Sequence, residues 1–399
     1  MISAVWLSGA GVFAGAEVDR SGPGGGSAVF AGYVPAWGVE GMAARDPAAA
    51  GLTHLIYAFA KPEYEPGSGA VRIVFDFEGN GLSGGRGREA FESFLANAGP
   101  DVRRLLSIGG WGLSESFSDI AASGEARESF AEEAARLVAD HGLDGVDLDW
   151  EYPVAGGAEN MVHRPEDAAN FVKLARAVRG ALDDLPRAHG ESPSLLTIAI
   201  PGSHGALVER YRIRVLGRHV DWFNLMAYDY AGGWSPRTAH YSPLRADRTP
   251  LHEAASAEGA VASLRFQGVP PDKIVLGMGL SGVRFEGVRP EGAGWLGADY
   301  ESVADEAGGS GADDFRNLDP VVALPVDGGS DWVLGWDRIA RASYWTSARS
   351  GTLISFESVR SAEEKAAFAA GAGLRGLMFW SVEKDSEDLR LIRSAIGGW

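Results

Sequence analysis

Three carboxylates at alternate positions are the residues of this chain best placed to do chemistry. Asp147, Asp149 and Glu151 lie in the stretch 143–153, where acidic and apolar residues alternate until a proline ends the run. Successive side chains of an extended strand point to opposite faces, so the three acids are expected to share one face. Crowded carboxylates cannot all ionise freely, so at least one should have a raised pKa, which a general acid near neutral pH requires.

Two other interpretations of this acidic stretch stay open at this level. Alternating acids also occur on solvated strand faces, and a carboxylate cluster can bind a hard cation. The opposite face, formed by Val146, Leu148 and Trp150, is apolar enough to be buried, and buried acids are costly unless they are used or paired. The local pattern therefore favours catalysis over a metal site or a solvated strand.

Apolar runs that alternate with helical segments are expected to position these acids. The runs expected as strands are 28–34, 52–60, 102–108, 143–153, 195–200, 220–228, 274–278 and 376–382. One helix should end at Gly142, and a second should begin near Pro165 and bury Phe171, Leu174, Val178 and Leu182. The helix before the last strand should open with a capping box, Ser361 as N-cap and Glu364 three residues on.

Strands separated by helices indicate a parallel sheet, because parallel neighbours need long crossover connections. An open doubly wound sheet would favour a Gly-rich phosphate loop after the first strand, and residues 33–37 (YVPAW) are not one. Aromatic and acidic residues instead gather after several different strands, as in barrel enzymes. The fold class expected is therefore α/β, a (β/α)8 TIM barrel.

The chain is expected to have three parts. The barrel would take 28–282 and 358–390. Residues 283–357 are too many for a loop and carry several Trp and Tyr, so they should form a small α+β insertion between strand 7 and helix 7. Residues 1–27 should be an N-terminal extension and Gly-rich linker, disordered or part of an export signal.

Composition excludes several classes of partner and site. The chain of 399 residues is 45% hydrophobic and has a net charge of −18, which argues against nucleic acid or an anionic membrane as partner. A neutral polymer fits better. The absence of cysteine excludes disulfides and thiolate metal sites, and no apolar run is long enough for a membrane span.

Aromatic side chains are expected at or just beyond the ends of several strands. They are Tyr33, Trp37, Phe59, Trp111, Tyr228, Tyr230, Trp234 and Trp380. A single aromatic residue is most often part of a core, but their shared position favours a binding surface. Flat apolar faces suit the C–H faces of sugar rings, while nearby carboxylates suit the hydroxyl edges. The pattern predicts a cleft that binds a polysaccharide.

Glu151 and Asp149 have different expected roles in such a cleft. Glycosidic bond cleavage needs a protonated carboxyl beside the leaving oxygen and a group that captures the oxocarbenium ion. Glu151, the last and longest acid, is the expected general acid. Asp149 is too close in sequence to act as an independent carboxylate across the sugar ring. The nucleophile is therefore expected to belong to the substrate.

The stretch 144–151 matches every fixed position of the DxxDxDxE signature of glycoside hydrolase family 18, and the chain resembles the chitinases of that family. Supporting matches are 107–110 (SIGG), 226–230 (MAYDY) and 376–381 (GLMFWS). The resemblance covers about 28–385. It implies a (β/α)8 barrel, and it makes 283–357 look like the α+β insertion that deepens the cleft in bacterial-type members.

The resemblance also implies hydrolysis of β-1,4-linked N-acetylglucosamine with retention, in which the substrate's acetamido oxygen attacks C1 while Glu151 protonates the glycosidic oxygen. Asp149 would orient the acetamido group, Asp147 would share a proton with Asp149, and Tyr228 would hydrogen-bond the acetamido carbonyl. The substrate contacts expected are Tyr33, Trp37, Phe59, Trp111, Met226, Asp229, Trp234 and, as the floor of the −1 subsite, Trp380. No metal or cofactor is expected.

The expected partner is chitin or a chito-oligosaccharide, bound by a monomer. An extracellular location is expected because chitin is insoluble. An endo-β-N-acetylglucosaminidase acting on N-glycans or wall glycan stays open, as does a non-catalytic chitin-binding lectin, although the presence of Glu151 argues against a lectin. One departure concerns the substrate contacts. Where the family commonly shows Tyr-Gly-Arg, this chain has Ser281, Gly282 and Val283, with Arg284 displaced by one.

Overall fold

Eight parallel strands form a closed barrel in the computed structural model, which describes residues 27–42, 44–77, 82, 86–186, 192–246, 255–291, 294–304, 314–318 and 331–399. In order around the barrel they are β1 (Val29–Pro35), β2 (His54–Tyr64), β4 (Arg103–Gly109), β5 (Gly145–Asp149), β6 (Leu195–Pro201), β7 (Trp222–Met226), β8 (Ile274–Gly279) and β16 (Gly376–Trp380). Pairing of β1 with both β2 and β16 closes the ring. The expected (β/α)8 fold is confirmed. The predicted extension 1–27 lies outside the described residues except for Ser27.

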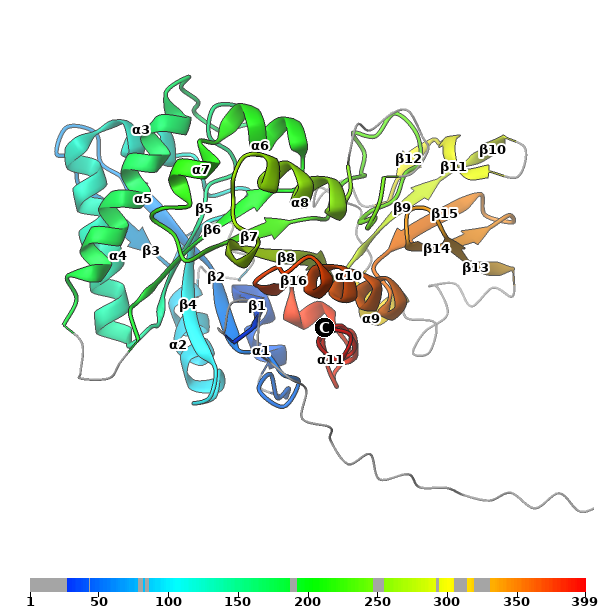
Figure 1. The fold of residues 1–399 in the computed structure, drawn as a ribbon, viewed down its shortest axis with the longest axis horizontal. Coiled ribbons are helices and arrows are strands. Elements are labelled where there is room, and N and C mark those ends of the chain that lie inside the picture. The colour runs from blue at the N-terminus through cyan, green and yellow to red at the C-terminus, as the bar shows by residue number, and fades with distance from the viewer. Residues whose placement is uncertain are drawn as a thin grey trace, which may run out of the picture.

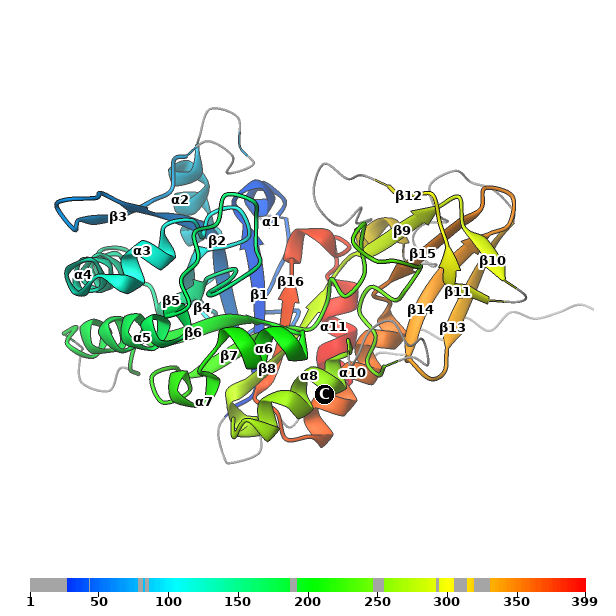
Figure 2. The ribbon, with the colours of Figure 1, turned by 90° about the horizontal axis from the view of Figure 1, so that it is seen from above.

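Helices surround the barrel (Figures 1 and 2). They are α1 (Val39–Met42), α2 (Gly87–Asn97), α3 (Phe117–Ala122), α4 (Gly124–His141), α5 (Asp167–Asp183), α6 (His204–Arg210), α7 (Ile213–Leu216), α8 (Ala257–Phe266), α10 (Val359–Gly371) and α11 (Arg390–Gly397). Short 3-10 turns η1 (Ala36–Gly38), η3 (Pro271–Lys273) and η5 (Val382–Lys384) lie beside β1, β8 and β16. None of the helices in the described ranges is long and apolar enough to cross a membrane.

Two of the three helix predictions are confirmed. Helix α4 ends at Gly142, which adopts the left-handed conformation (φ 60°), and α5 buries its predicted apolar stripe. The predicted position of the capping box is wrong by three residues. Ser358 is the N-cap of α10 and accepts a hydrogen bond from the Ser361 amide, so Ser361 is the third helical residue. Glu364 instead pairs with Arg341 at 2.9 Å.

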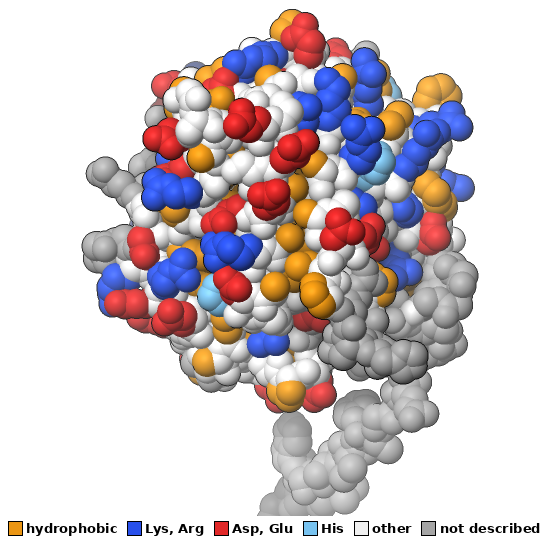
Figure 3. All heavy atoms as spheres, turned by 90° about the vertical axis from the view of Figure 1, so that its left-hand side faces the viewer, with side chains coloured by type: hydrophobic (Ala, Val, Ile, Leu, Met, Phe, Trp, Pro, Cys, Tyr) orange, Lys and Arg blue, Asp and Glu red, His pale blue; other side chains and the backbone are white. Residues whose placement is uncertain are grey.

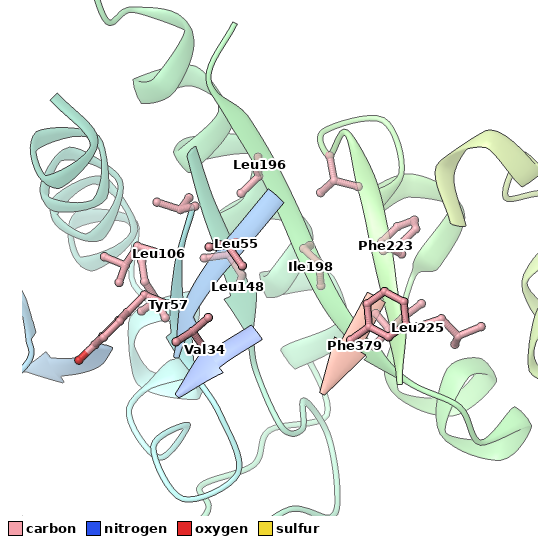
Figure 4. Packing of buried hydrophobic residues seen from close by; sticks show 14 of the residues in the cluster. Val34, Leu55, Tyr57, Leu106, Leu148, Leu196, Ile198, Phe223, Leu225 and Phe379 are labelled. Carbon is pink, nitrogen blue, oxygen red and sulfur yellow. The ribbon is translucent and has the colours of Figure 1, made fainter. Parts of the chain in front are cut away.

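Side chains alternate between the two faces of each strand, and the two faces have different surroundings. Outward-facing residues such as Val146 and Leu148 pack under the helices with Leu55, Leu196 and others (Figure 4). Inward-facing residues include Ala31, Ile56 and Met378, which form a second cluster. This alternation directs Asp147 and Asp149 to the inside of the barrel, away from the apolar layer that Val146 and Leu148 occupy.

The acidic strand is shorter than predicted. Strand β5 covers Gly145–Asp149, so Glu151 lies beyond the strand end and not on it. At the other end, the Leu143 amide donates to the Val138 carbonyl, which makes Leu143 part of the termination of α4. The three acids are still close together, but a loop positions the last of them.

An α+β insertion lies between β8 and α10, that is, between strand 7 and helix 7 of the barrel. Its main sheet is antiparallel, in the order β12-β9-β15-β14-β13, and lies to the right of the barrel in Figure 1. The elements are β9 (Gly282–Glu286), β10 (Arg289–Glu291), β11 (Gly294–Asp299), β12 (Ser302–Val303), α9 (Phe315–Leu318), β13 (Trp332–Asp337), β14 (Ala342–Ser347) and β15 (Thr352–Phe356). The domain boundaries at 282 and 358 stay predictions.

Candidate active site

The site is built at the carboxyl ends of the barrel strands. The structure places the predicted residues as follows: Tyr33 in β1, Trp37 in η1, Phe59 in β2, Trp111 after β4, Asp147 and Asp149 in β5, Glu151 after β5, Met226 in β7, Tyr228, Asp229 and Trp234 in the loop after β7, and Trp380 at the end of β16. Side chains from six of the eight barrel strands or their loops therefore meet at one end of the barrel.

Asp147 is fully buried and accepts four hydrogen bonds. Its Oδ2 accepts from the hydroxyls of Tyr33 and Ser107, each at 2.8 Å, and its Oδ1 accepts from Thr197 Oγ1 at 2.6 Å and Asn224 Nδ2 at 3.1 Å. Burial raises the pKa of Asp147 above its usual value, although all four donors favour the charged form. Asp147 is thus a fixed acceptor beneath the other two acids.

Asp149 has a different environment two residues further on. Its side chain is buried, and its Oδ1 has no hydrogen-bond partner among the described residues. Burial is the main cause that raises the pKa of Asp149 well above its usual value, and the charges of Glu151 and Asp147 raise it further. Burial and the two neighbouring charges therefore all favour the protonated form of Asp149.

Glu151 is poised between its two protonation states near pH 7. Burial raises its pKa to about 7, a hydrogen bond from Tyr152 opposes the rise, and the charge of Asp229 adds to it. A carboxyl with such a pKa can both donate and accept a proton under ordinary conditions, which general acid and base catalysis requires. The expectation that at least one acid has a raised pKa is met by all three.

Two glycines at the end of β4, Gly109 in the strand and Gly110 directly after it, bring the chain close to the acidic strand. Gly109 has φ 113°, and a Cβ there would lie 2.2 Å from the Asp149 carbonyl oxygen. The Gly110 amide donates to the same oxygen at 2.8 Å, and a Cβ on Gly110 would meet the Phe59 ring at 2.9 Å. The sequence Gly109-Gly110 thus permits a close approach that no side chain would allow.

Aromatic rings form the inner part of the site around Trp380. Its ring stacks on Phe59, with centroids 5.7 Å apart and planes at 28°, and meets Tyr33 edge-on at 5.7 Å. Phe59 is the extra residue where the pairing of β2 with β4 shifts register between Ala58 and Ala60, and this bulge re-aims its side chain. Tyr228 is buried nearby, and Met226 is partly buried.

The outer aromatic residues are open to solvent. Trp37 is 47% exposed, Trp111 is 57% exposed and Trp234 is 58% exposed. Large exposed indole rings are unusual on a folded protein and mark binding surfaces when they surround a functional site. These three rings can offer flat faces to a long ligand, whereas Tyr33, Tyr228 and Trp380 lie deeper.

A lysine occupies the region where the sequence departs from the family pattern. Lys384 Nζ donates to Ser281 Oγ at 2.8 Å and lies 3.9 Å from Asp314. Its charge lowers the pKa of Asp229, as does a hydrogen bond from Tyr241, although burial raises that pKa more strongly. Ser281 therefore helps to hold the ammonium group of Lys384 near Asp229.

Sequence reasoning missed several residues of the site. They are Ser114, Tyr152, Thr197, Asn224, Tyr241 and Lys384. Thr197 and Asn224 each carried a usable signal, because each is a single polar residue inside an apolar strand. Among the described residues, no group of three or more His, Asp or Glu side chains is arranged to hold a metal ion.

Comparisons with known proteins identify the family of this chain and several relatives. The model of the glycosyl hydrolases family 18 matches residues 29–385. Chitinase A1 of Niallia circulans is 33% identical over 309 residues, which cover 73% of this chain but only 42% of that protein. Chitinase 1 of Aphanocladium album is 30% identical over 387 residues, which cover 94% of this chain and 85% of that protein.

A solved structure is similar over nearly the whole chain. The glycoside hydrolase family 18 N-acetylglucosaminidase of Paenibacillus barengoltzii superposes with a TM-score of 0.75 at 29% identity, and the match covers 94% of this chain and 100% of that one. The barrel fold is thus shared with an enzyme of known structure.

Proposed function

Since the chain belongs to the glycosyl hydrolases family 18 and is a glycoside hydrolase, we propose that it is a chitinase that cleaves β-1,4-linked N-acetylglucosamine with retention of configuration. The observation that carries the proposal is the pair Asp149 and Glu151, two buried carboxyls with raised pKa values beside the aromatic rings around Trp380. This arrangement suits an acid that acts on a sugar lying over a flat ring.

In the proposed first step, Glu151 gives its proton to the glycosidic oxygen while the substrate's own acetamido oxygen attacks C1. An attacking group that is already part of the substrate removes a bimolecular entropy cost that can reach about 7–11 kcal/mol. Asp149 passes its proton to Asp147, accepts a hydrogen bond from the acetamido N–H, and offsets the positive charge of the oxazolinium ring with its own negative charge. Asp147 has four donors around it, so one of its hydroxyl partners, Ser107 or Tyr33, turns from donor to acceptor when Asp147 takes that proton.

In the proposed second step, Glu151 accepts a proton from a water molecule that opens the oxazolinium ring. Tyr228 donates to the acetamido carbonyl, and Trp380 lies beneath the −1 sugar. Met226, Asp229, Tyr33 and Phe59 line the same sugar, and Trp37, Trp111 and Trp234 support its neighbours. The proposal includes no metal or cofactor.

Replacing Glu151 by glutamine tests the assignment of the acid. Glu151→Gln should lower kcat for release of chitobiose from chitin by about 10²–10⁴-fold, because the amide cannot transfer a proton. Binding of chitotetraose, measured by calorimetry, should survive. Glu132→Gln on the exposed face of α4 is the matched control and should leave kcat unchanged. Undiminished turnover by Glu151→Gln would refute the assignment.

The exact substrate is open between a linear polymer and a glycoprotein glycan. A time course of products from chitin hexamer and from an N-glycan separates a chitinase from an endo-β-N-acetylglucosaminidase. The exposed tryptophans favour the linear polymer, since they extend the surface beyond a single sugar. A lectin without activity would bind both glycans and cleave neither. We further propose that the enzyme acts as an extracellular monomer.

A further inference from the structure

Ser114, in the loop after β4, forms hydrogen bonds with the backbone of both Asp149 and Glu151. Its side chain is fully buried. The hydroxyl oxygen lies 2.9 Å from the Gly110 carbonyl oxygen, 3.0 Å from the Asp149 carbonyl oxygen and 3.0 Å from the Glu151 amide nitrogen. Because a hydroxyl has one proton and two lone pairs, Ser114 donates to one of the carbonyls and accepts from the Glu151 amide.

Ser114 acts where the barrel ladder stops. The last pairs of β5 are Asp149 with Gly109 on one side and Leu148 with Ile198 on the other. Glu151 comes two residues later, so its backbone has no strand neighbour to hold it. The side chain of Ser114 takes over that function, because it binds the Glu151 amide in place of a ladder carbonyl.

The loop that carries Ser114 is itself held closely to the acidic strand. The Gly110 amide donates to the Asp149 carbonyl. Gly109 packs so closely against that carbonyl that a side chain would not fit between them. The exposed Trp111 ring also meets the Tyr152 ring edge-on, with centroids 6.3 Å apart. Asp149 before Glu151 and Tyr152 after it are therefore both in contact with residues 109–111.

We propose that Ser114 is a positioning residue that holds the backbone of Glu151 so that its carboxyl reaches the leaving oxygen. The inference rests on the proposed function of Glu151 as the general acid. Ser114 itself touches neither the substrate nor the proton in transfer. Its loss would let the acid move, and a displacement of about 1 Å in a catalytic group can cost about 10²-fold in rate.

The test compares two substrates whose leaving groups differ in how much they need protonation by Glu151. A chito-oligosaccharide has a poor leaving group that needs the acid, whereas the 4-nitrophenyl glycoside of chitobiose releases a stable anion that needs little proton transfer. Ser114→Ala should lower kcat/KM for chitotetraose by about 10²-fold and kcat/KM for the aryl glycoside by much less. The ratio of the two losses is the readout, because general damage to the fold would lower both constants equally.

Ser118→Ala is the matched control. Ser118 is an equally buried serine four residues on, and it bonds to Asp167 and Arg164 and not to the acidic strand. The Ser118→Ala substitution should change kcat/KM for chitotetraose and kcat/KM for the aryl glycoside by the same factor. Should Ser114→Ala fold poorly, Ser114→Cys fills nearly the same space with a weak donor and should show the same selective loss at smaller size.

Equal losses on the two substrates, or no loss, in the Ser114 variants would overturn the positioning role. Failure of the proposed function would look different. In that case the wild-type protein would cleave neither substrate, or Glu151→Gln would be as active as wild type on chitotetraose, and the inference about Ser114 would fall with it.

Discussion

At the scale of single residues, the environment divides three neighbouring carboxylates into different states. Asp147 has four donors around it, Asp149 has an oxygen without a partner among the described residues, and Glu151 accepts a hydrogen bond from Tyr152. All three pKa values are raised, because burial disfavours each charge. The acids are chemically alike, so only their surroundings can assign them separate tasks.

Two substitutions should shift the pH dependence of kcat/KM in opposite directions. The acid is active while protonated, so activity should fall as pH rises through the pKa of Glu151, about 7. Tyr152→Phe removes a hydrogen bond that lowers this pKa, so the falling limb should move to higher pH. Asp229→Asn removes a charge that raises it, so the limb should move to lower pH. Measuring kcat/KM on chitotetraose from pH 4 to 10 checks both.

Tyr230→Phe controls for the loss of a phenol hydroxyl, because Tyr230 bonds to the Gly202 carbonyl and not to an acid. Its profile should match wild type. A limb that stayed in place in both Tyr152→Phe and Asp229→Asn, or that moved the same way in both, would contradict the assignment of the limb to Glu151.

At the scale of elements, a buried ion pair fastens the insertion to the barrel. Glu357 follows β15 directly, Lys365 lies in α10, and Ser242 lies in the loop after β7; all three side chains are buried. Lys365 donates to Glu357 and to Ser242, and Ser361 also donates to Glu357 at 2.6 Å. Burial lowers the pKa of Lys365, whereas Glu357 opposes this by favouring the ammonium form.

Breaking this pair should destabilise the protein strongly. Lys365→Met leaves the Glu357 carboxylate buried without its cation, which should lower the free energy of unfolding by about 3–5 kcal/mol in urea titrations. The double variant Lys365→Met/Glu357→Gln should recover much of the loss. Arg72→Ala, which breaks the exposed pair with Glu63, should change stability by no more than about 1 kcal/mol. A Lys365→Met variant as stable as wild type would disprove the role of the pair.

At the scale of the whole molecule, charge favours a neutral ligand. The net charge is −18, and on the face opposite the insertion acidic and basic side chains are mixed over the left and centre, with basic ones gathered at the upper right (Figure 3). A net charge of this size repels a polyanion, whereas an uncharged polysaccharide is indifferent to it. The exposed tryptophans at the barrel end, and not the surface charge, are the features suited to bind it.

Removal of divalent ions should leave the enzyme active. Asp147 is already saturated with hydrogen bonds, so the acids are better explained by proton chemistry than by a cation. Overnight dialysis against EDTA should therefore leave kcat/KM on chitotetraose unchanged. Loss of activity that added Ca²⁺ or Mg²⁺ restores would reverse the choice between a catalytic and a metal-binding trio. Dialysis against buffer without EDTA is the control.

The amino-acid sequence determined the local features of this protein. Alternation along a strand separates Val146 and Leu148 from Asp147 and Asp149, and helical spacing defines α5 and its buried stripe. Gly142 ends α4 because glycine adopts the left-handed conformation without strain. Each of these depends only on residues near one another in the chain, which is why the barrel and its acidic strand could be predicted.

Only the tertiary structure decided what surrounds the acids. Tyr33 lies 114 residues from Asp147 along the chain and Asn224 lies 77 residues from it, yet both bond to its carboxyl. The strand ends before Glu151, and Ser114, 37 residues away, holds the amide of that acid. Burial and hydrogen bonding across the barrel set the pKa of each carboxyl, and neither exists until distant strands have closed the ring.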